Sequence, residues 1–171
     1  NPTQRVVFSP TRDANPFFHF FESLWMLAGR NDVKFVERFN PQMKAYSDDG
    51  LRIWGAYGQR WRHHFGHDQL DELVKLLRAD PDSRRGVVAM WSPDGDQVCR
   101  VTGHGGEIVL GGPTGKDVPC NTHLYFKIRG GALRMTVCCR SNDMLCGAYG
   151  ANAVHMSMLQ EYLAGKLGVR V

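Results

Sequence analysis

The stretch KDVPCNTHLYFKIRGGALRMTVCCRSNDM, residues 116–144, holds the clearest β-hairpin signal in the chain. Two runs rich in β-branched and aromatic residues flank the Gly-Gly pair at 130–131, which favours a tight turn. Cys120 follows a proline where loop becomes strand, and its thiol can act as a nucleophile or pack as a small apolar group. The adjacent Cys138 and Cys139 point to opposite faces of the second run, and we expect them to fill the sheet core.

Helical and extended patterns surround this hairpin. Asn15-Pro16 ahead of FFHFFESLWMLAG predicts a helix with Asn15 as its N-cap, buried because its side chains are apolar on nearly every side. The other expected elements are a short helix at 32–40, an amphipathic helix at 67–79, a strand at 86–91, a glycine-rich loop or hairpin at 92–117 and a final helix at 151–168. No repeat or linker divides them. We therefore expect one domain over residues 1–171, of the α/β (α+β) class, with a mixed sheet packed by helices.

The composition is that of a globular protein, with 171 residues, 43% hydrophobic and 22% charged. The net charge of +4 is mild, and the Lys and Arg residues form no run. This charge distribution suits binding of a phosphorylated small molecule as well as binding of nucleic acid. No apolar stretch approaches the roughly 20 residues of a membrane span, and no signal pattern opens the chain, so we expect a cytoplasmic protein. Five cysteines without regular spacing indicate reduced thiols.

Charged residues at three places could bind or react with a ligand. Arg84 and Arg85 lie at a helix-to-strand turn, where the guanidinium fork suits a phosphate, although a solvated pair would look the same. Arg140 and Ser141 add a third guanidinium and a hydroxyl group after the hairpin. Glu22 lies in the middle of the apolar first helix, where a carboxylate is costly to bury unless it is paired. It is therefore either an active-site group or half of a structural salt bridge.

Two further patterns carry weaker signals. His63, His64 and His67 have spacings that could bind zinc, but Gly66 interrupts the stretch and no fourth ligand is evident, so we assign no metal site. The segment GGPTGK at 111–116 ends in Gly-Lys but lacks the following Ser or Thr and the full spacing of a P-loop.

Five stretches, in this order, resemble the thymidylate synthase superfamily. They are FESLWMLAGRND (21–32), GAYGQRWR (55–62), DPDSRRGVVAMW (80–91), VPCNTHLYFKI (118–128) and CRSNDMLCGAYGANA (139–153). Each alone is weak, but five in order across residues 15–168 form a specific match. The resemblance implies the family's fold, 5,10-methylenetetrahydrofolate as cofactor and a homodimer with shared active sites.

The resemblance implies three catalytic residues. Cys120 matches the nucleophile that adds to C6 of a pyrimidine nucleoside monophosphate. Glu22 matches the glutamate that organises water and proton transfer at the base, and Tyr57 matches the tyrosine linked to proton removal from C5. Thiolate addition at C6 makes C5 nucleophilic, so covalent catalysis replaces one difficult step with two easier ones.

The resemblance also implies binding residues. Arg84 and Arg85 match the arginines that reach the phosphate bound in the partner subunit, while Arg140 and Ser141 match phosphate contacts within one subunit. The other expected contacts are Asn121, Ala151 and Asn152 with the nucleotide, and Asp143, Met43 and Trp54 with the folate.

Three departures from the synthase pattern bear on the product. Met43 and Tyr46 stand where synthases usually carry two tryptophans, the first of which helps to commit the methylene to hydride. A methionine there would admit water, which gives a hydroxymethyl group in place of a methyl group. Asn121 stands where synthases usually have histidine, and the base-reading asparagine falls at Ala151, with Asn152 one step away.

We therefore expect a pyrimidine nucleotide 5-hydroxymethylase, with CMP or dCMP as substrate. The alternatives are a thymidylate synthase that methylates dUMP and a remnant that binds nucleotide or RNA without turnover. The expected partner is a pyrimidine nucleoside monophosphate, not a membrane or a nucleic acid. The family continues past the final helix with a segment that holds the ribose and closes over folate, and from its end at Val171 we expect this chain to lack that segment.

Overall fold

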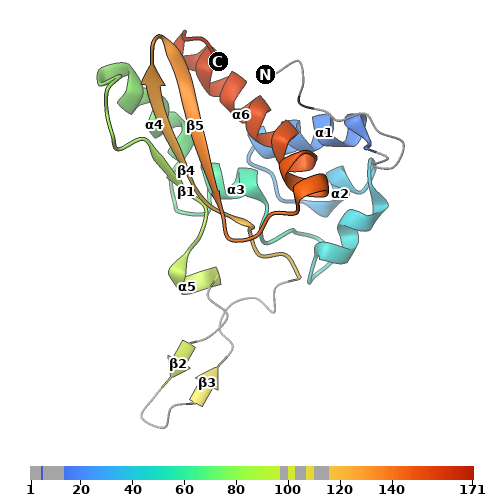
Figure 1. The fold of residues 1–171 in the computed structure, drawn as a ribbon. Coiled ribbons are helices and arrows are strands. Elements are labelled where there is room, and N and C mark those ends of the chain that lie inside the picture. The colour runs from blue at the N-terminus through green and yellow to red at the C-terminus, as the bar shows by residue number, and fades with distance from the viewer. Residues whose placement is uncertain (1–4, 6–13, 97–99, 103–106, 110–115) are drawn as a thin grey trace.

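A computed structural model describes residues 5, 14–96, 100–102, 107–109 and 116–171 of the chain. Figure 1 shows helices packed beside a small sheet. In chain order the elements are α1 (Pro16–Leu27), α2 (Val33–Val36), the 3-10 helix η2 (Pro41–Tyr46), α3 (Tyr57–Arg62), α4 (Gln69–Ala79), β1 (Val87–Ala89), α5 (Pro93–Asp96), β2 (Arg100–Thr102), β3 (Glu107–Val109), β4 (Asn121–Arg129), β5 (Ala132–Cys139), the π-helix η3 (Met144–Ala148) and α6 (Ala151–Leu167). Among the described helices, none is long and apolar enough to cross a membrane.

The main sheet has three antiparallel strands in the order β1-β4-β5. The predicted hairpin forms β4 and β5, and its turn residues Gly130 and Gly131 have φ values of 58° and 71°, which side-chain-bearing residues rarely adopt. The expected α+β class is confirmed. Named strands in the described segments pair antiparallel, including the separate pair β2-β3, and a parallel contact occurs as an isolated bridge between Ala132 and Arg170.

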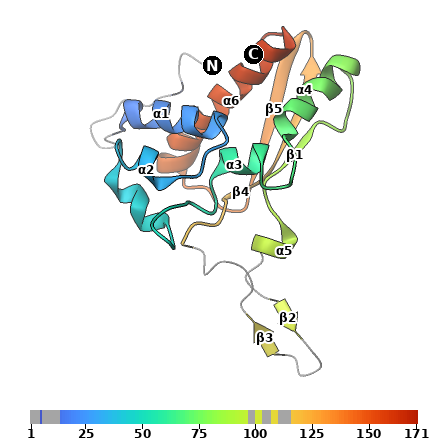
Figure 2. The same ribbon diagram turned by 180° about the vertical axis from the view of Figure 1, so that it is seen from behind.

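One face of the three-stranded sheet forms the core. Val88, Leu124 and Phe126 have no exposed surface, and Val88 lies opposite Leu124 across the strand pair. Burying each such side chain stabilises the fold by about 1.5–3 kcal/mol. Figure 2 shows α3, α4 and α6 on the same side of this sheet. On the other face, Val87 is 50% exposed and Thr136 is exposed, so that face of the sheet is open.

Helix α1 begins as predicted but is not buried on every side. The Asn15 side chain accepts a hydrogen bond from the Phe18 backbone amide at 2.9 Å and so caps the helix. Phe17, Phe20 and Leu24 are 73%, 46% and 40% exposed, which contradicts the prediction of a fully buried helix. Because these residues are spaced i, i+3 and i+7, they share one face, and α1 packs on α6 and α3 through its other faces.

A β-bulge at the start of β4 lies next to Cys120, the candidate nucleophile. The register shifts there, so that Asn121 lies opposite Cys139 whereas His123 lies opposite Cys138. Regular alternation from the buried Leu124 would turn Asn121 outward together with the exposed His123. The bulge reverses this direction, and Asn121 is fully buried.

Gly58 allows α3 to pack against the end of α1. A Cβ atom at Gly58 would lie 1.9 Å from the carbonyl oxygen of Met26, which belongs to the backbone and cannot rotate away. Replacing Gly58 with alanine is therefore expected to lower the free energy of unfolding by about 1–3 kcal/mol or more, measured by urea denaturation. Gly165→Ala in α6 is the matched control, because nothing lies within 4 Å of its Cβ position. It should keep or raise stability, and an equal loss in both variants would contradict the steric explanation.

Candidate functional site

A cleft of about 470 Å³ lies between α1, η2, α3 and the first turns of α6. Its volume is typical of small-molecule sites. Predicted site residues from four separate elements line it, namely Glu22, Met43, Tyr57, Ala151 and Asn152. The fold therefore brings together the groups that the sequence placed at distant positions.

Glu22 is buried in the wall of this cleft and paired with a histidine. One of its carboxylate oxygens, Oε2, lies 2.8 Å from Nε2 of His155 in α6, and the two residues are 8% and 4% exposed. His19, one helical turn before Glu22, places its ring 6.0 Å from that of His155. The Glu22 carboxylate thus lies at ion-pair distance from an imidazole and also faces the cleft, so both alternatives for Glu22 stay open.

The same three residues have a spacing that would allow a metal ion. The ligating atoms of His19, Glu22 and His155 all lie within 4.8 Å of one another. Two imidazoles and a carboxylate are a ligand set found in zinc enzymes. In the present arrangement the Glu22 carboxylate is already engaged by His155.

The three histidines at 63, 64 and 67 lie in different environments. The His64 ring packs edge-on against Trp54 at 5.7 Å between centroids. His67 lies 3.5 Å from Glu72 on α4, and His63 is exposed. These contacts explain their positions without a shared ligand.

Tyr57 connects the cleft to the nucleophile candidate. Burial raises the pKa of the Tyr57 phenol, and the neighbouring Cys120 and Asp117 raise it further. The backbone amide of Cys120 hydrogen-bonds to this phenol, and the Cys120 side chain is half-buried. The expected nucleophile and the expected proton-transfer residue therefore lie side by side.

Arg140 stabilises the loop that carries Cys120. Its guanidinium donates hydrogen bonds to the carbonyl oxygens of Pro119 and Val118, each at 3.0 Å, and stacks over the Trp91 ring at 5.4 Å. Its backbone amide donates to the Cys120 carbonyl at 2.9 Å. A guanidinium has five donors, so Arg140, which is exposed, keeps donors for a phosphate.

The other predicted phosphate and folate contacts lie outside the cleft wall. Arg84 and Arg85 are exposed in the segment before β1, and Ser141 is exposed after β5. Asp143 caps η3, because its carboxylate accepts a hydrogen bond from the Cys146 backbone amide. The roles that the family resemblance implies for these residues stay predictions.

Asn121 and Cys139 form a contact that the sequence did not suggest. The Cys139 thiol donates to Oδ1 of Asn121 at 2.8 Å, and the buried Nδ2 has no hydrogen-bond partner in the described part of the chain. Cys139 is exposed and Cys138 half-buried, so the prediction that they fill the sheet core is wrong. The end of β5 extends beyond the buried part of the sheet, which lies at the start of that strand.

Arg60 and Asp96 form a fully buried ion pair that the sequence analysis missed. The guanidinium makes two hydrogen bonds to the carboxylate, at 2.6 and 2.8 Å, and donates to the Met90 carbonyl at 2.8 Å. Trp54 donates to the same carboxylate at 3.0 Å, so this predicted folate contact belongs to a structural cluster and does not line the cleft. Burial opposes ionisation of Asp96, but hydrogen bonds led by Arg60 outweigh it and lower its pKa.

Asp117 is a cleft residue that no sequence pattern singled out. Its Oδ2 accepts a hydrogen bond from the Gly55 backbone amide at 3.1 Å. Burial raises the pKa of the Asp117 carboxyl, and the Glu22 charge adds to the rise, whereas Gly55, Arg60 and Arg140 act in the opposite direction. The available signal was a charged residue just ahead of the Pro-Cys pair in KDVPC.

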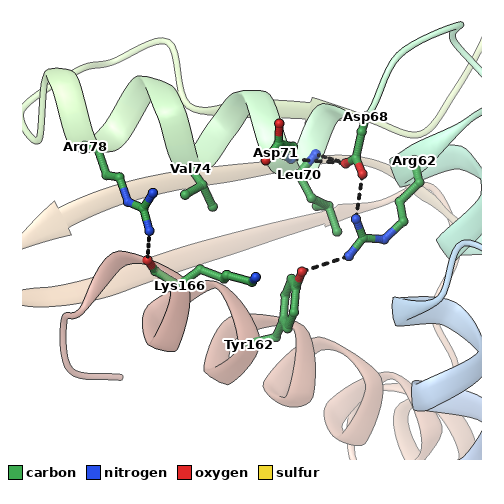
Figure 3. A pocket seen from close by; sticks show the side chains of 8 residues that line it. All are labelled: Arg62, Asp68, Leu70, Asp71, Val74, Arg78, Tyr162 and Lys166. Carbon is green, nitrogen blue, oxygen red and sulfur yellow. Dashed lines mark hydrogen bonds and ion pairs between the residues drawn. The ribbon is translucent and has the colours of Figure 1, made fainter.

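A second hollow, of about 190 Å³, lies between α4 and α6 (Figure 3). Its polar groups already engage one another. Arg62 donates to Asp68 at 2.6 Å and to the Tyr162 hydroxyl at 3.1 Å, and Arg78 donates to the Lys166 carbonyl. We interpret these hydrogen bonds as structural contacts that hold α6 against α4.

Comparisons with known proteins bear on the family and the fold. The family model described as Thymidylate synthase matches residues 11–171. The chain is 52% identical over 169 residues to a deoxyuridylate hydroxymethyltransferase of Pseudomonas phage M6, covering 98% of this chain and 44% of that protein. It is 39% identical over 181 residues to the enzyme of the same name from Bacillus phage SP01, covering 100% of this chain and 44% of that protein.

The fold also matches a solved structure. The crystal structure of thymidylate synthase from T4 phage superimposes with a TM-score of 0.67 at 19% identity, over 90% of this chain and 53% of that one. The chain thus spans about half the length of the relatives that it matches. Because the family model matches nearly the whole sequence, the chain belongs to the thymidylate synthase family.

Proposed function

We propose that this chain carries the reaction centre of a pyrimidine nucleotide 5-hydroxymethylase that uses 5,10-methylenetetrahydrofolate. The main support is that Glu22 and Tyr57 line one cleft and that the backbone of Cys120 hydrogen-bonds to the Tyr57 phenol at its edge. The names of the two phage relatives favour deoxyuridylate as the substrate. The sequence-based preference for CMP or dCMP stays a prediction, and the product analysis described below tests it.

The cleft has features that suit both substrates. Phe18, Met43 and Ile53 give it an apolar wall that fits a flat ring system, and Asn152 adds a polar group. Asn152 donates to the Asn142 side chain at 3.0 Å, which orients its amide. The folate would supply a one-carbon unit at the oxidation level of formaldehyde.

The chain's own residues would carry the steps on the nucleotide. The Cys120 thiolate adds to C6 and makes C5 nucleophilic, and Tyr57 assists removal of the C5 proton. Arg140 holds the Cys120 loop and offers its free donors to the phosphate. Water then adds to the exocyclic methylene on C5, and expulsion of the Cys120 thiolate restores the aromatic pyrimidine.

We further propose that the enzyme is a cytoplasmic homodimer. The open sheet face offers a surface for a second copy, with Val87 50% exposed in β1. The exposed Arg84 and Arg85 could then reach a partner's phosphate, since neither lines the cleft of their own chain. The described cysteines are free thiols, as suits a reducing compartment.

Product analysis tests the proposal directly. Incubation of the full-length protein with methylenetetrahydrofolate and dUMP, dCMP or CMP in turn is expected to give a 5-hydroxymethyl nucleotide and tetrahydrofolate, with dUMP as the best substrate. Chromatography with mass spectrometry identifies both products. A 5-methyl nucleotide with dihydrofolate would identify a synthase instead. Salt-sensitive RNA binding without turnover would support the binding remnant.

A further inference from the structure

We propose that Asp117 is a catalytic residue whose carboxylate binds the water that attacks the exocyclic methylene and removes a proton from it. The inference rests on the proposed hydroxymethylation and assigns a general base to the attack of water on the methylene. Asp117 lines the same cleft as Glu22 and Tyr57, three positions before Cys120 in the chain.

The position of the Asp117 carboxylate is set by the backbone. The Gly55 amide donates to Oδ2, and no hydrogen bond from a described residue engages Oδ1. A Cβ atom at residue 55 would lie only 2.8 Å from Oδ2, so glycine is what allows this close approach. One oxygen is thus anchored while the other can accept a hydrogen bond from a water molecule in the cleft.

Three ionisable groups near Asp117 have other contacts or other roles in the reaction. Glu22 is engaged by His155 at 2.8 Å, and Cys120 would be bonded to C6 of the nucleotide during this step. Burial keeps the Tyr57 phenol protonated by raising its pKa, so it is not a base for water. Asp117 combines one carboxylate oxygen anchored by the Gly55 amide with a second oxygen that accepts no hydrogen bond from a described residue.

The electrostatic surroundings of Asp117 suit a general base. Burial raises its pKa and the Glu22 charge from α1 adds to the rise, while Gly55, Arg60 and Arg140 limit it. A carboxylate with a raised pKa is a stronger base once it is ionised, and such catalysis contributes about 10²–10⁴-fold in rate. Hydroxymethylation should therefore fall in acid as Asp117 becomes protonated.

The step balances without a further reactant. The water oxygen bonds to the methylene carbon as Asp117 takes one of its protons. The electron pair of the exocyclic double bond moves toward the C4 carbonyl as an enolate, then forms the C5–C6 double bond and expels the Cys120 thiolate. Asp117 passes its proton to solvent. Nothing is oxidised or reduced.

The full-length Asp117→Asn variant separates the attack of water from the steps that precede it. Formation of the 5-hydroxymethyl product is expected to fall about 10²–10⁴-fold. In a single turnover, with enzyme in excess over nucleotide, release of tritium from C5 of labelled dUMP should stay within about threefold of wild type, because it precedes water attack. Added 2-mercaptoethanol should yield a 5-thiomethyl ether, since a thiolate needs no base. Asp71→Asn on the surface of α4, where Asp71 pairs with Lys75, is the matched control and should leave all three readouts unchanged.

Stability gives a second readout with a defined sign. Because the folded-state pKa of Asp117 is raised, the ionised carboxylate destabilises the fold, and stability falls as pH rises toward the folded pKa. Asp117→Asn keeps an acceptor for Gly55 and removes the charge, so its melting temperature at pH 7 should exceed that of wild type, with the difference vanishing in acid. A lower melting temperature would indicate a structural role.

Two outcomes would overturn the assignment of Asp117. One is hydroxymethylation retained within about threefold in the variant. The other is an equal fall of tritium release and product within a single turnover, which would place Asp117 before the water step. If wild-type protein itself released no tritium with any pyrimidine nucleotide, the proposed function would fail first, and that result is distinct from both.

Discussion

Replacing Cys120 with serine is expected to abolish tritium release from C5-labelled dUMP in the presence of methylenetetrahydrofolate. Removing a covalent nucleophile can cost up to about 10⁶ in rate, and we expect a loss on the order of 10⁴-fold or more. A serine hydroxyl is a much weaker nucleophile than a thiolate near neutral pH. The backbone contacts of residue 120 with Arg140 and Tyr57 do not involve the sulfur, so nucleotide binding measured by calorimetry should persist.

Cys138→Ser provides the matched control for this prediction. Cys138 is a half-buried cysteine of the same hairpin, and its contact with Thr122 uses the backbone carbonyl. Tritium release should therefore match wild type. Wild-type exchange in Cys120→Ser would rule out the covalent mechanism, and loss in the Cys138 variant would mean that the wrong sulfur had been assigned.

Replacing Asp96 with asparagine is expected to lower the free energy of unfolding by about 3–5 kcal/mol. Arg60 and Asp96 are each 0% exposed at the side chain, so the variant leaves a guanidinium charge buried without its counter-ion. Guanidinium chloride denaturation measures the effect. The lowered pKa of Asp96 means that its contribution is present above its unfolded pKa and disappears as pH falls through the folded value. The difference between the two proteins should therefore shrink in acid.

Two controls test whether burial causes this effect. The double variant Arg60→Met/Asp96→Leu removes both charges and should recover much of the lost stability. Lys75→Met breaks the exposed Lys75–Asp71 pair on α4 and should change stability little. A loss below about 1 kcal/mol in Asp96→Asn would show that the buried pair behaves like a surface one.

Local sequence patterns were enough to predict most elements near the site. The Gly-Gly turn and the alternating runs predicted β4 and β5, and the Asn15 cap with Pro16 predicted the start of α1. Such signals work because a turn or a cap is decided by residues adjacent in the chain. The short elements α3, α5 and η3 were not predicted, because helices of four to six residues carry too little periodicity.

The sequence by itself determined the family, the strand–turn–strand unit that carries Cys120, and which residues could do the chemistry. The tertiary structure alone decided three other features. It paired Arg60 with Asp96, 36 positions away, and it inserted the bulge that turns Asn121 inward. It also placed Asp117 against Gly55, 62 positions distant. These contacts join segments that no local pattern links. They form because a charge buried away from water is costly unless the packed chain supplies a partner for it.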